Sequence, residues 1–182
     1  MAATSDRERA LDGYLVASAR LGDRKAMGLL VERWDGRLRA HAWRLLGDAD
    51  AARDAAQEAW AEIVRGLARL ADERAFPAWA YRIVSRRCAR QIGAALRRRR
   101  LEAAVAAEPP PAAAAAEQAD GERLRRAIRA LPPGQRAALA LYHFEELSVA
   151  ETAVALDVPA GTVKTRLMHA RRKLRAALEG DE

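Results

Sequence analysis

The sequence has little of what builds disulfides, metal sites and catalytic centres. Its 182 residues include one cysteine, Cys88, and three histidines that lie far apart, at positions 41, 143 and 169. One thiol cannot close an internal disulfide, and no spacing of cysteine and histidine matches a metal site. A glycine-rich phosphate loop and a carboxylate cluster are also missing. We therefore expect no catalytic activity, no metal and no cofactor, and a reducing, cytoplasmic setting.

Long hydrophobic runs are absent as well. No stretch approaches the roughly 18 uninterrupted apolar residues of a membrane span, and the N-terminus lacks the apolar core of a secretory signal. Aromatic residues make up only 5% of the chain although 51% of it is apolar, because most of the apolar surplus is alanine. Alanine favours helices and buries little surface per residue. The composition therefore predicts an all-α protein of small helical domains, and 182 residues suit one ordinary domain or two small ones.

Lysine is scarce, and acids are missing from particular segments. Only three of the 32 basic residues are lysine, a bias that GC-rich codon usage produces, and the formal net charge is +7. Residues 79–100 contain eight arginines and no acid, residues 101–122 contain five acids and no base, and residues 158–178 contain no acid. Codon usage explains arginine in place of lysine, but it does not explain the missing acids. Basic helical faces without acids are typical of proteins that bind nucleic acid.

A proline- and alanine-rich segment divides the chain. Residues 108–116 read EPPPAAAAA, and three consecutive prolines cannot lie inside a helix. The segment also has too few large apolar side chains to pack into a core. We therefore assign residues 101–120 to an acidic linker, which separates an N-terminal unit, 1–100, from a C-terminal unit, 121–182.

The N-terminal unit has the pattern of three helices. Asp23 is a good N-cap and Gly47 a good C-cap for the first of them. A second helix is expected over 49–70, and a break at 70–77 precedes a third helix over 78–100.

The third helix carries a row of cations. Its arginines at i, i+4, i+8 and i+15 form one ridge of unpaired like charge, and they are Arg82, Arg86, Arg90 and Arg97. Such a ridge is tolerated in solvent, but a polyanionic partner explains it better.

The C-terminal unit has the pattern of a helix-turn-helix. Ser148 and Glu151 form a capping box at the start of a helix over 149–156. Asp157 and Val158 make the turn, Pro159 occupies the first turn of the next helix, and that helix continues to about residue 178. Its apolar stripe leaves a polar, donor-rich face, as in helices that lie in the DNA major groove. The other interpretation of this face is a solvated surface on an ordinary helical hairpin.

The motifs in the two units resemble one known family. Residues 131–178, with their Leu-Pro-Pro-x-x-Arg opening and the run from Gly161 to Arg166, resemble region 4 of bacterial RNA polymerase sigma factors of the extracytoplasmic-function (ECF) group in the sigma-70 family. The N-terminal unit resembles region 2 of the same family through three motifs: Gly22-Asp23 with Ala26, Asp54-x-x-Gln57-Glu58, and Phe76 with Trp79, Tyr81, Arg82 and Ile83. The resemblance covers nearly the whole chain apart from the linker and the termini, in the family's minimal two-domain form.

The resemblance implies a function, partners and site residues. The chain would be a dissociable specificity subunit that binds core RNA polymerase and directs initiation at specific promoters, and an anti-sigma factor is a common partner in the family. Region 2 would dock on the β′ clamp helices through Asp54, Gln57 and Glu58, and region 4 would dock on the β flap. A requirement for solubility also explains why these three polar residues lie on an exposed helix face. The side chains implied at the −10 element, where region 2 melts the promoter, are Arg74, Phe76, Arg82, Arg86 and Arg90. Those implied at the −35 element are Thr162, Lys164, Thr165, Arg166, His169, Arg171 and Arg172.

Several points remain open on the sequence. Phe76 beside a proline fits the hydrophobic core as well as a base pocket. The family usually carries Asn at the position of Arg86 and Asp or Asn at that of Arg90, and it carries glycine where this chain has Asp157. The acidic linker fits both a mimic of a nucleic-acid strand and a solvated spacer. The alternative function is a helix-turn-helix regulator that binds DNA without engaging core polymerase.

Overall fold

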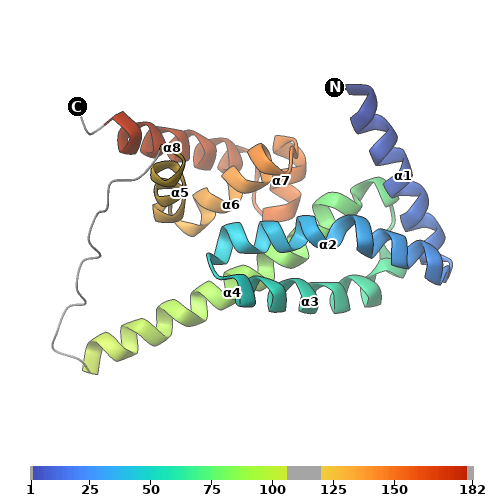
Figure 1. Cartoon of the computed structure of the whole chain (residues 1–182), viewed down its shortest axis with the longest axis horizontal. Coiled ribbons are helices and arrows are strands. Elements are labelled where there is room, and N and C mark those ends of the chain that lie inside the picture. Colours follow the sequence, from blue (N-terminus) through green and yellow to red (C-terminus); the bar gives the residue numbers. More distant parts are fainter. Residues whose placement is uncertain (1, 106–119, 180–182) are drawn as a thin grey trace.

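The computed structural model describes residues 2–105 and 120–179, and within these ranges the regular elements are all helical. The N-terminal unit consists of α1 (Ala2–Arg20), α2 (Arg24–Leu46), α3 (Ala49–Gly66) and α4 (Phe76–Val105). The C-terminal unit consists of α5 (Asp120–Ala130), α6 (Pro133–Leu139), a π-helical turn (Ala140–Phe144), α7 (Val149–Leu156) and α8 (Ala160–Glu179). Figure 1 shows this order, which confirms the all-α prediction.

Local capping signals set the start and end of α2. The Asp23 carboxylate accepts hydrogen bonds from the backbone N–H groups of Lys25 and Ala26, at 2.8 and 3.1 Å. Gly47 ends α2 in the left-handed conformation, with φ 74°, which glycine adopts without steric cost. Both predicted caps are confirmed. Helix α1 was not among the predicted helices, and it packs against α2 through the buried Leu15 and Val16.

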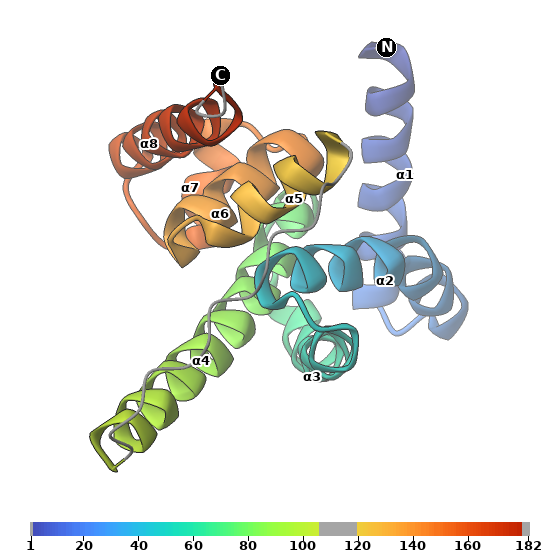
Figure 2. The same cartoon turned by 60° about the vertical axis from the view of Figure 1, so that its left-hand side comes forward.

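The second and third predicted helices differ from the structure at their ends. Helix α3 stops at Gly66, and a tight turn over Leu67–Arg69 follows. The side chain of Trp79 lies so close to Gly66 that a Cβ added there would be 2.9 Å from the ring. Helix α4 continues five residues into the predicted linker, to Val105, and Figure 2 shows its C-terminal half extending beyond the other helices. Residues 106–119 lie outside the described residues.

The helix-turn-helix has its expected local chemistry. The Ser148 N–H donates to the Glu151 carboxylate at 2.8 Å, and the Glu151 N–H donates to the Ser148 hydroxyl at 3.2 Å, so the capping box is confirmed. Asp157 ends α7 in the left-handed conformation, with φ 55°. Pro159 lies directly before α8 instead of in its first turn, and its carbonyl accepts the N–H groups of Thr162 and Val163.

Aromatic rings fill the centre of the N-terminal unit. The fully buried Trp34 meets Phe76 and Tyr81 edge-on, with ring centroids 5.2 and 5.8 Å apart. His41 is also fully buried, and its Nε2 lies 2.9 Å from the Ser85 hydroxyl. Burial, assisted by the charge of Arg44, lowers the pKa of His41 to about 3. The imidazole is therefore neutral and structural.

The two units share one hydrophobic core. Ala137, Leu141, Leu147 and Ala155 of the C-terminal unit are buried in the same cluster as the side chains around Trp34. Helix α7 packs along α4, and α6 packs against α2. Cys88 of α4 belongs to this cluster, and burial raises the pKa of its thiol to about 12. The two units on either side of the predicted linker thus pack face to face in the structure (Figures 1 and 2).

Candidate nucleic-acid interface

Helix α8 presents a polar face on the side away from its buried stripe. Val163, Leu167 and Ala170 are buried, while Thr165 and Arg172 are exposed on the opposite side. The Thr165 hydroxyl donates to the carbonyl of Gly161 at 3.0 Å, within the same helix. This face lacks acids until Glu179, as the sequence indicated.

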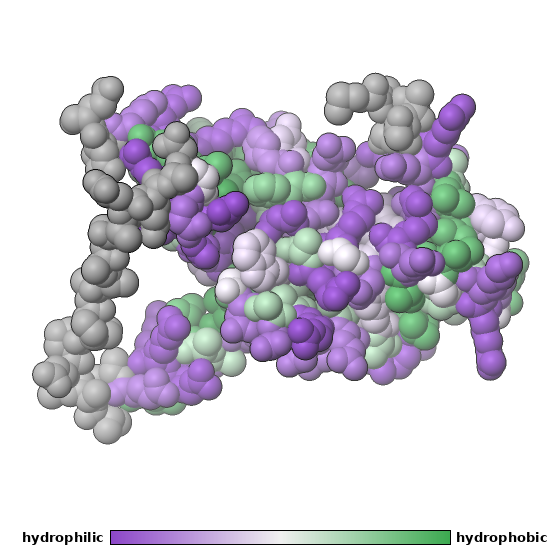
Figure 3. Space-filling model, in the orientation of Figure 1, coloured by the Kyte–Doolittle hydropathy of each residue, from purple (hydrophilic) through white to green (hydrophobic). Residues whose placement is uncertain are grey.

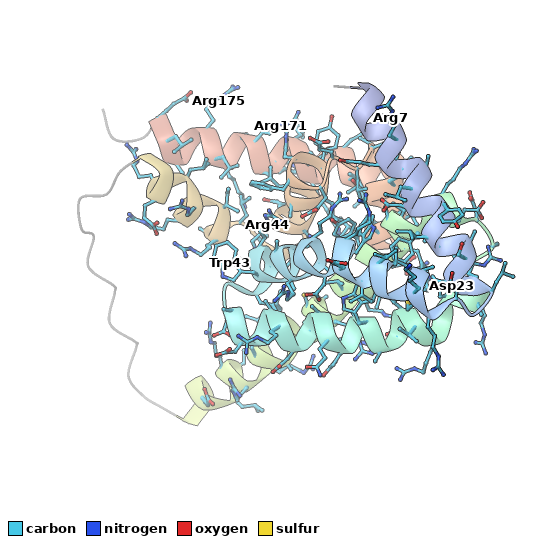
Figure 4. The ribbon with its side chains drawn as sticks, turned by 45° about the vertical axis from the view of Figure 1, so that its right-hand side comes forward. Arg7, Asp23, Trp43, Arg44, Arg171 and Arg175 are labelled. Atoms are coloured by element: carbon cyan, nitrogen blue, oxygen red, sulfur yellow. The ribbon has the colours of Figure 1, made fainter. Side chains whose placement is uncertain are left out.

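One flank of this face is a basic groove of about 500 Å³. Its floor is apolar and includes Tyr142 and Met168, and its rim is basic. The rim residues are Lys164, Arg171, Arg172 and Arg175. Figure 4 shows Arg171 and Arg175 on the outer side of α8, and Figure 3 shows hydrophilic side chains along that edge.

The Arg171 guanidinium rests on neighbouring rings. It lies 5.8 Å from the ring centroid of Tyr142 and 3.4 Å from Nε2 of His143. Burial, assisted by the charge of Arg171, lowers the pKa of His143. The neutral imidazole adds no second positive charge beside Arg171, and the guanidinium is always charged, so it is available to an anionic partner.

Arg166 lies on the other flank and does not join this groove. Its guanidinium carbon is 3.2 Å from where a Cβ on Gly134 would stand, so it packs against the start of α6. It lines a cleft of about 340 Å³ between the two units, together with Arg82 and Arg86 of α4. The residues implied at the −35 element therefore lie on two sides of α8, with Arg171 on one flank and Arg166 on the other, as helical periodicity indicates.

The arginine ridge on α4 is not the unpaired row that the sequence analysis predicted. Arg86 forms an ion pair with Glu62 of α3, and Arg82 pairs with Asp157 at 3.0 Å. Arg87 adds contacts to Glu58 and Glu62 at 2.5 and 2.9 Å. These carboxylates come from elements that pack beside α4, which the spacing within one helix does not reveal. Arg90 and Arg97 are exposed, and within the described residues neither has an ion-pair partner.

Phe76 belongs to the core. Its side chain is fully buried against Trp34, so it cannot stack on a base in this conformation, and the core alternative is the correct one. Arg74, two residues earlier, is exposed at the break before α4.

A groove that the sequence analysis missed lies beside that break. It has a volume of about 610 Å³ between the end of α3 and the start of α4, and the half-buried ring of Trp79 forms part of its wall. Two arginines, Arg65 and Arg69, also line it. An aromatic face with nearby guanidinium groups is suited to an unstacked base and its phosphate. The spacing of Arg65 and Arg69, one helical turn apart, was the available signal.

The acidic face predicted for polymerase contact is solvent-accessible. Asp54, Gln57 and Glu58 are exposed on α3, and Glu58 forms an ion pair with Arg87. Glu62, the next acid on this helix, is half-buried between Arg86 and Arg87. Hydrogen bonds from Arg87 and the charge of Arg86 outweigh burial and lower the pKa of Glu62.

Comparisons with known proteins identify the family. Residues 30–101 match the family described as sigma-70 region 2, and residues 121–174 match sigma-70, region 4. The ECF RNA polymerase sigma factor SigM of Mycobacterium tuberculosis is 32% identical over 168 residues, which cover 92% of this chain and 85% of the relative. The chain belongs to the ECF sigma factors. The RNA polymerase sigma-H factor of Pseudomonas aeruginosa is 30% identical, over 92% of this chain and 94% of that protein.

Solved sigma factors have the same fold. The structure of CnrH in complex with the cytosolic domain of CnrY matches with a TM-score of 0.70 and 28% identity, covering 94% of this chain and 99% of CnrH. The sigma factor RpoE of Bartonella quintana, solved with the anti-sigma factor NepR, matches with a TM-score of 0.64 and 22% identity, covering 87% and 99% of the two chains. As an ECF sigma factor, the chain is a specificity subunit of RNA polymerase that directs initiation at particular promoters. We refer below to its N-terminal and C-terminal units as region 2 and region 4.

Two further observations concern the described residues. None of their helices has the length and apolar character needed to cross a membrane. They also hold no cluster of three or more His, Cys, Asp or Glu side chains able to bind a metal ion.

Proposed function

We propose that region 4 reads the −35 element with the outer side of α8. The observation that carries this proposal is the acid-free, exposed face of the second helix in a helix-turn-helix. Thr165 and Arg172 stand furthest from the core and would reach base edges, with Thr162 and His169 beside them. Lys164 and Arg171 on the basic rim would hold phosphates and fix the register. Arg166 would join the base contacts once region 4 leaves region 2.

Region 2 would open the −10 element at the break before α4. Taking a base out of the stack costs a few kcal/mol, so the site must supply stacking and phosphate contacts. The groove with Trp79, Arg65 and Arg69 offers both, and the exposed Arg74 and Arg90 add charge on either side. Arg82 and Arg86 would contribute after exchanging their carboxylate partners for phosphates, while Phe76 supports the site from the core.

Core polymerase would meet the exposed face of α3. Asp54, Gln57 and Glu58 would contact the β′ clamp helices, and region 4 would contact the β flap. We further propose that the protein has no catalysis of its own and acts in the cytoplasm, where its polymerase works. An anti-sigma factor is the remaining proposed partner, and support for it comes from the family.

In vitro transcription tests this function directly. The purified chain is mixed with core polymerase and a library of genomic promoter fragments, and open complexes are scored by permanganate reactivity of unpaired thymines. We expect a subset of promoters to open only when the chain is present. Failure to open any promoter would refute the proposal.

A pull-down separates the sigma factor from the alternative regulator. A tagged chain should retain the β′ subunit, whereas a helix-turn-helix regulator that does not engage core polymerase should not. Asp54→Asn should weaken β′ retention. Asp50→Asn is the matched control, because Asp50 is an exposed acid on the same helix and lies outside the proposed contact. Equal retention by the two variants would remove Asp54 from the polymerase contact.

A further inference from the structure

A pocket beside the end of α2 has aromatic and apolar walls. It has a volume of about 170 Å³, and its lining comes from α2, α5, α6 and the π-helical turn. The rings of Trp43 and Phe144 form part of the wall, and these residues are 46% and 48% exposed. Figure 4 shows Trp43 and Arg44 at this end of α2. Tryptophan and phenylalanine are mostly buried in folded proteins, so two half-exposed rings at one apolar pocket indicate a surface that a ligand covers.

Four guanidinium groups also line this pocket. They belong to Arg44, Arg125, Arg129 and Arg136. Arg44 pairs with Glu145 at 2.6 Å. Arg125 and Arg129 share a single carboxylate, that of Glu122, at 3.2 and 2.8 Å. The pocket therefore carries more positive than negative charge.

Arg136 is the least compensated of these cations. Its terminal nitrogens donate to the carbonyls of Arg129 and Leu45, both at 2.7 Å, and its Nε is buried without a hydrogen-bond partner. Burial lowers the pKa of Arg136, and within the ranges that the structure describes no carboxylate pairs with it to offset this effect. Cations that are withdrawn from water are stable when they are paired with an anion. The charge at this pocket is thus suited to an anionic ligand.

The size of the pocket limits the ligand to one ring. Pockets for drug-sized molecules have volumes of about 300–1,000 Å³, whereas an apolar cavity of about 150 Å³ holds benzene. A volume of about 170 Å³ therefore admits a single six-membered ring and is too small to enclose a nucleotide. Aromatic walls favour an aromatic ring, which packs against them edge-on or offset.

We propose that this pocket binds a small carboxylic acid with one aromatic ring. The ring packs against Trp43 and Phe144, and the carboxylate accepts hydrogen bonds from the exposed guanidinium groups of Arg125 and Arg129. The uncompensated charge of Arg136 adds to the attraction. This site goes beyond the proposed function, because none of the residues proposed to contact DNA or core polymerase lines it. It makes the sigma factor itself a receptor for a small molecule.

Three probes test which chemistry the pocket selects, with fluorine NMR on the full chain as the measurement. The first, 4-fluorobenzoate, has both the ring and the charge, while 4-fluorobenzamide has the same ring without the charge and fluoroacetate has the charge without the ring. We expect saturable binding of 4-fluorobenzoate and about tenfold weaker binding, or less, of the other two. Equal binding of the amide would show that the guanidinium groups do not select an anion. Equal binding of fluoroacetate would show attraction by surface charge alone, and either result overturns the proposal.

Two arginine variants of equal net charge locate the bound probe. Arg129→Gln removes a guanidinium group that lines the pocket, whereas Arg126→Gln removes an exposed one on the same helix that does not line it. Arg129→Gln should weaken 4-fluorobenzoate binding about fivefold or more, and Arg126→Gln should change it by less than about twofold. Equal losses in the two variants would mean diffuse attraction to α5. Unchanged binding in Arg129→Gln would place the probe elsewhere on the chain, and both outcomes contradict the proposal.

Glu122→Gln tests the charge in the opposite direction. It frees Arg125 and Arg129 from their shared carboxylate, so 4-fluorobenzoate should bind about threefold more tightly or better. Glu102→Gln is the matched control, because it raises the net charge equally at an exposed position outside the pocket and should leave the affinity unchanged. Weaker or unchanged binding in Glu122→Gln would argue against a carboxylate held by these two arginines.

Trp43→Ala tests the ring wall. Trp43 is half exposed, so the variant should fold, which circular dichroism checks, and it should bind 4-fluorobenzoate about fivefold more weakly or worse because the ring loses a packing surface. Full affinity in the folded variant would overturn the placement of the ring. All of these measurements use the free chain without DNA or polymerase. Open-complex formation by the parent with core polymerase therefore tests the proposed function separately, and neither result depends on the other.

Discussion

The buried His41 makes a quantitative prediction about pH. Its pKa is about 3 in the folded chain against an ordinary value of 6.5, so between these two values the unfolded chain binds more protons. Stability therefore falls as the pH decreases through 6.5. One unit of pKa difference is worth about 1.36 kcal/mol, so a change from pH 7.5 to pH 5 should lower the free energy of unfolding by about 2 kcal/mol through this residue alone.

Urea unfolding at the two pH values measures this loss. The parent should lose about 2 kcal/mol or more, and His41→Gln should lose about 2 kcal/mol less than the parent, whatever its own stability at pH 7.5. His143→Gln is the comparison: the pKa of His143 is also lowered, but its side chain is exposed, so it should account for a smaller part of the loss than His41. The ordinary pKa of Glu62, 4.5, and its lowered pKa in the fold both lie below this window, so it contributes little to the loss. An unchanged pH dependence in His41→Gln would refute the assignment of a neutral, buried imidazole.

Three further predictions follow from named side chains. Glu146 has the left-handed φ of 55° and an exposed side chain. A glycine there would relieve the backbone strain, which outweighs the extra conformational entropy of the unfolded chain, so Glu146→Gly should stabilise the fold by about 0.5 to 1 kcal/mol in thermal unfolding. An equal gain in Glu146→Ala would show that backbone strain is not the cause. In the polymerase complex, Arg166→Ala should lose about 1–3 kcal/mol of promoter-binding free energy that depends on one −35 base, whereas Arg171→Ala should weaken binding to all sequences and reduce the dependence of log affinity on log salt by about one unit. Identical losses on every promoter in both variants would contradict these two different roles. Trp79→Ala should slow open-complex formation on a duplex promoter and be rescued on a template already unpaired at −10; the absence of rescue would mean that Trp79 acts through folding.

The features that could be predicted from the sequence are those whose causes lie within a few residues. The Asp23 cap, the glycine at the end of α2 and the Ser148–Glu151 capping box are all local hydrogen-bonding or backbone preferences, and the structure has each of them. The extension of α4 to Val105 could also have been predicted, because residues 101–105 contain neither glycine nor proline.

The features that could not be predicted depend on packing between distant segments. The charges of Arg82 and Arg86 looked unpaired because their partners, Asp157 and Glu62, come from other helices. Arg166 lies in the cleft between the regions for the same reason, since the periodicity of α8 cannot show what stands beside it. Periodicity shows which side of a helix is apolar, but it does not show which neighbour carries the opposite charge.

The burial of Cys88 has a consequence for how this protein can receive signals. A thiol reacts with oxidants as the thiolate, and burial raises the pKa of Cys88 to about 12, so at neutral pH far less of it is ionised than of an exposed cysteine. Cys88 is the only cysteine in the sequence. In the folded chain, Cys88 is therefore a poor target for peroxide and for thiol-reactive compounds. A response of its promoters to oxidants through cysteine chemistry therefore requires a thiol on another molecule.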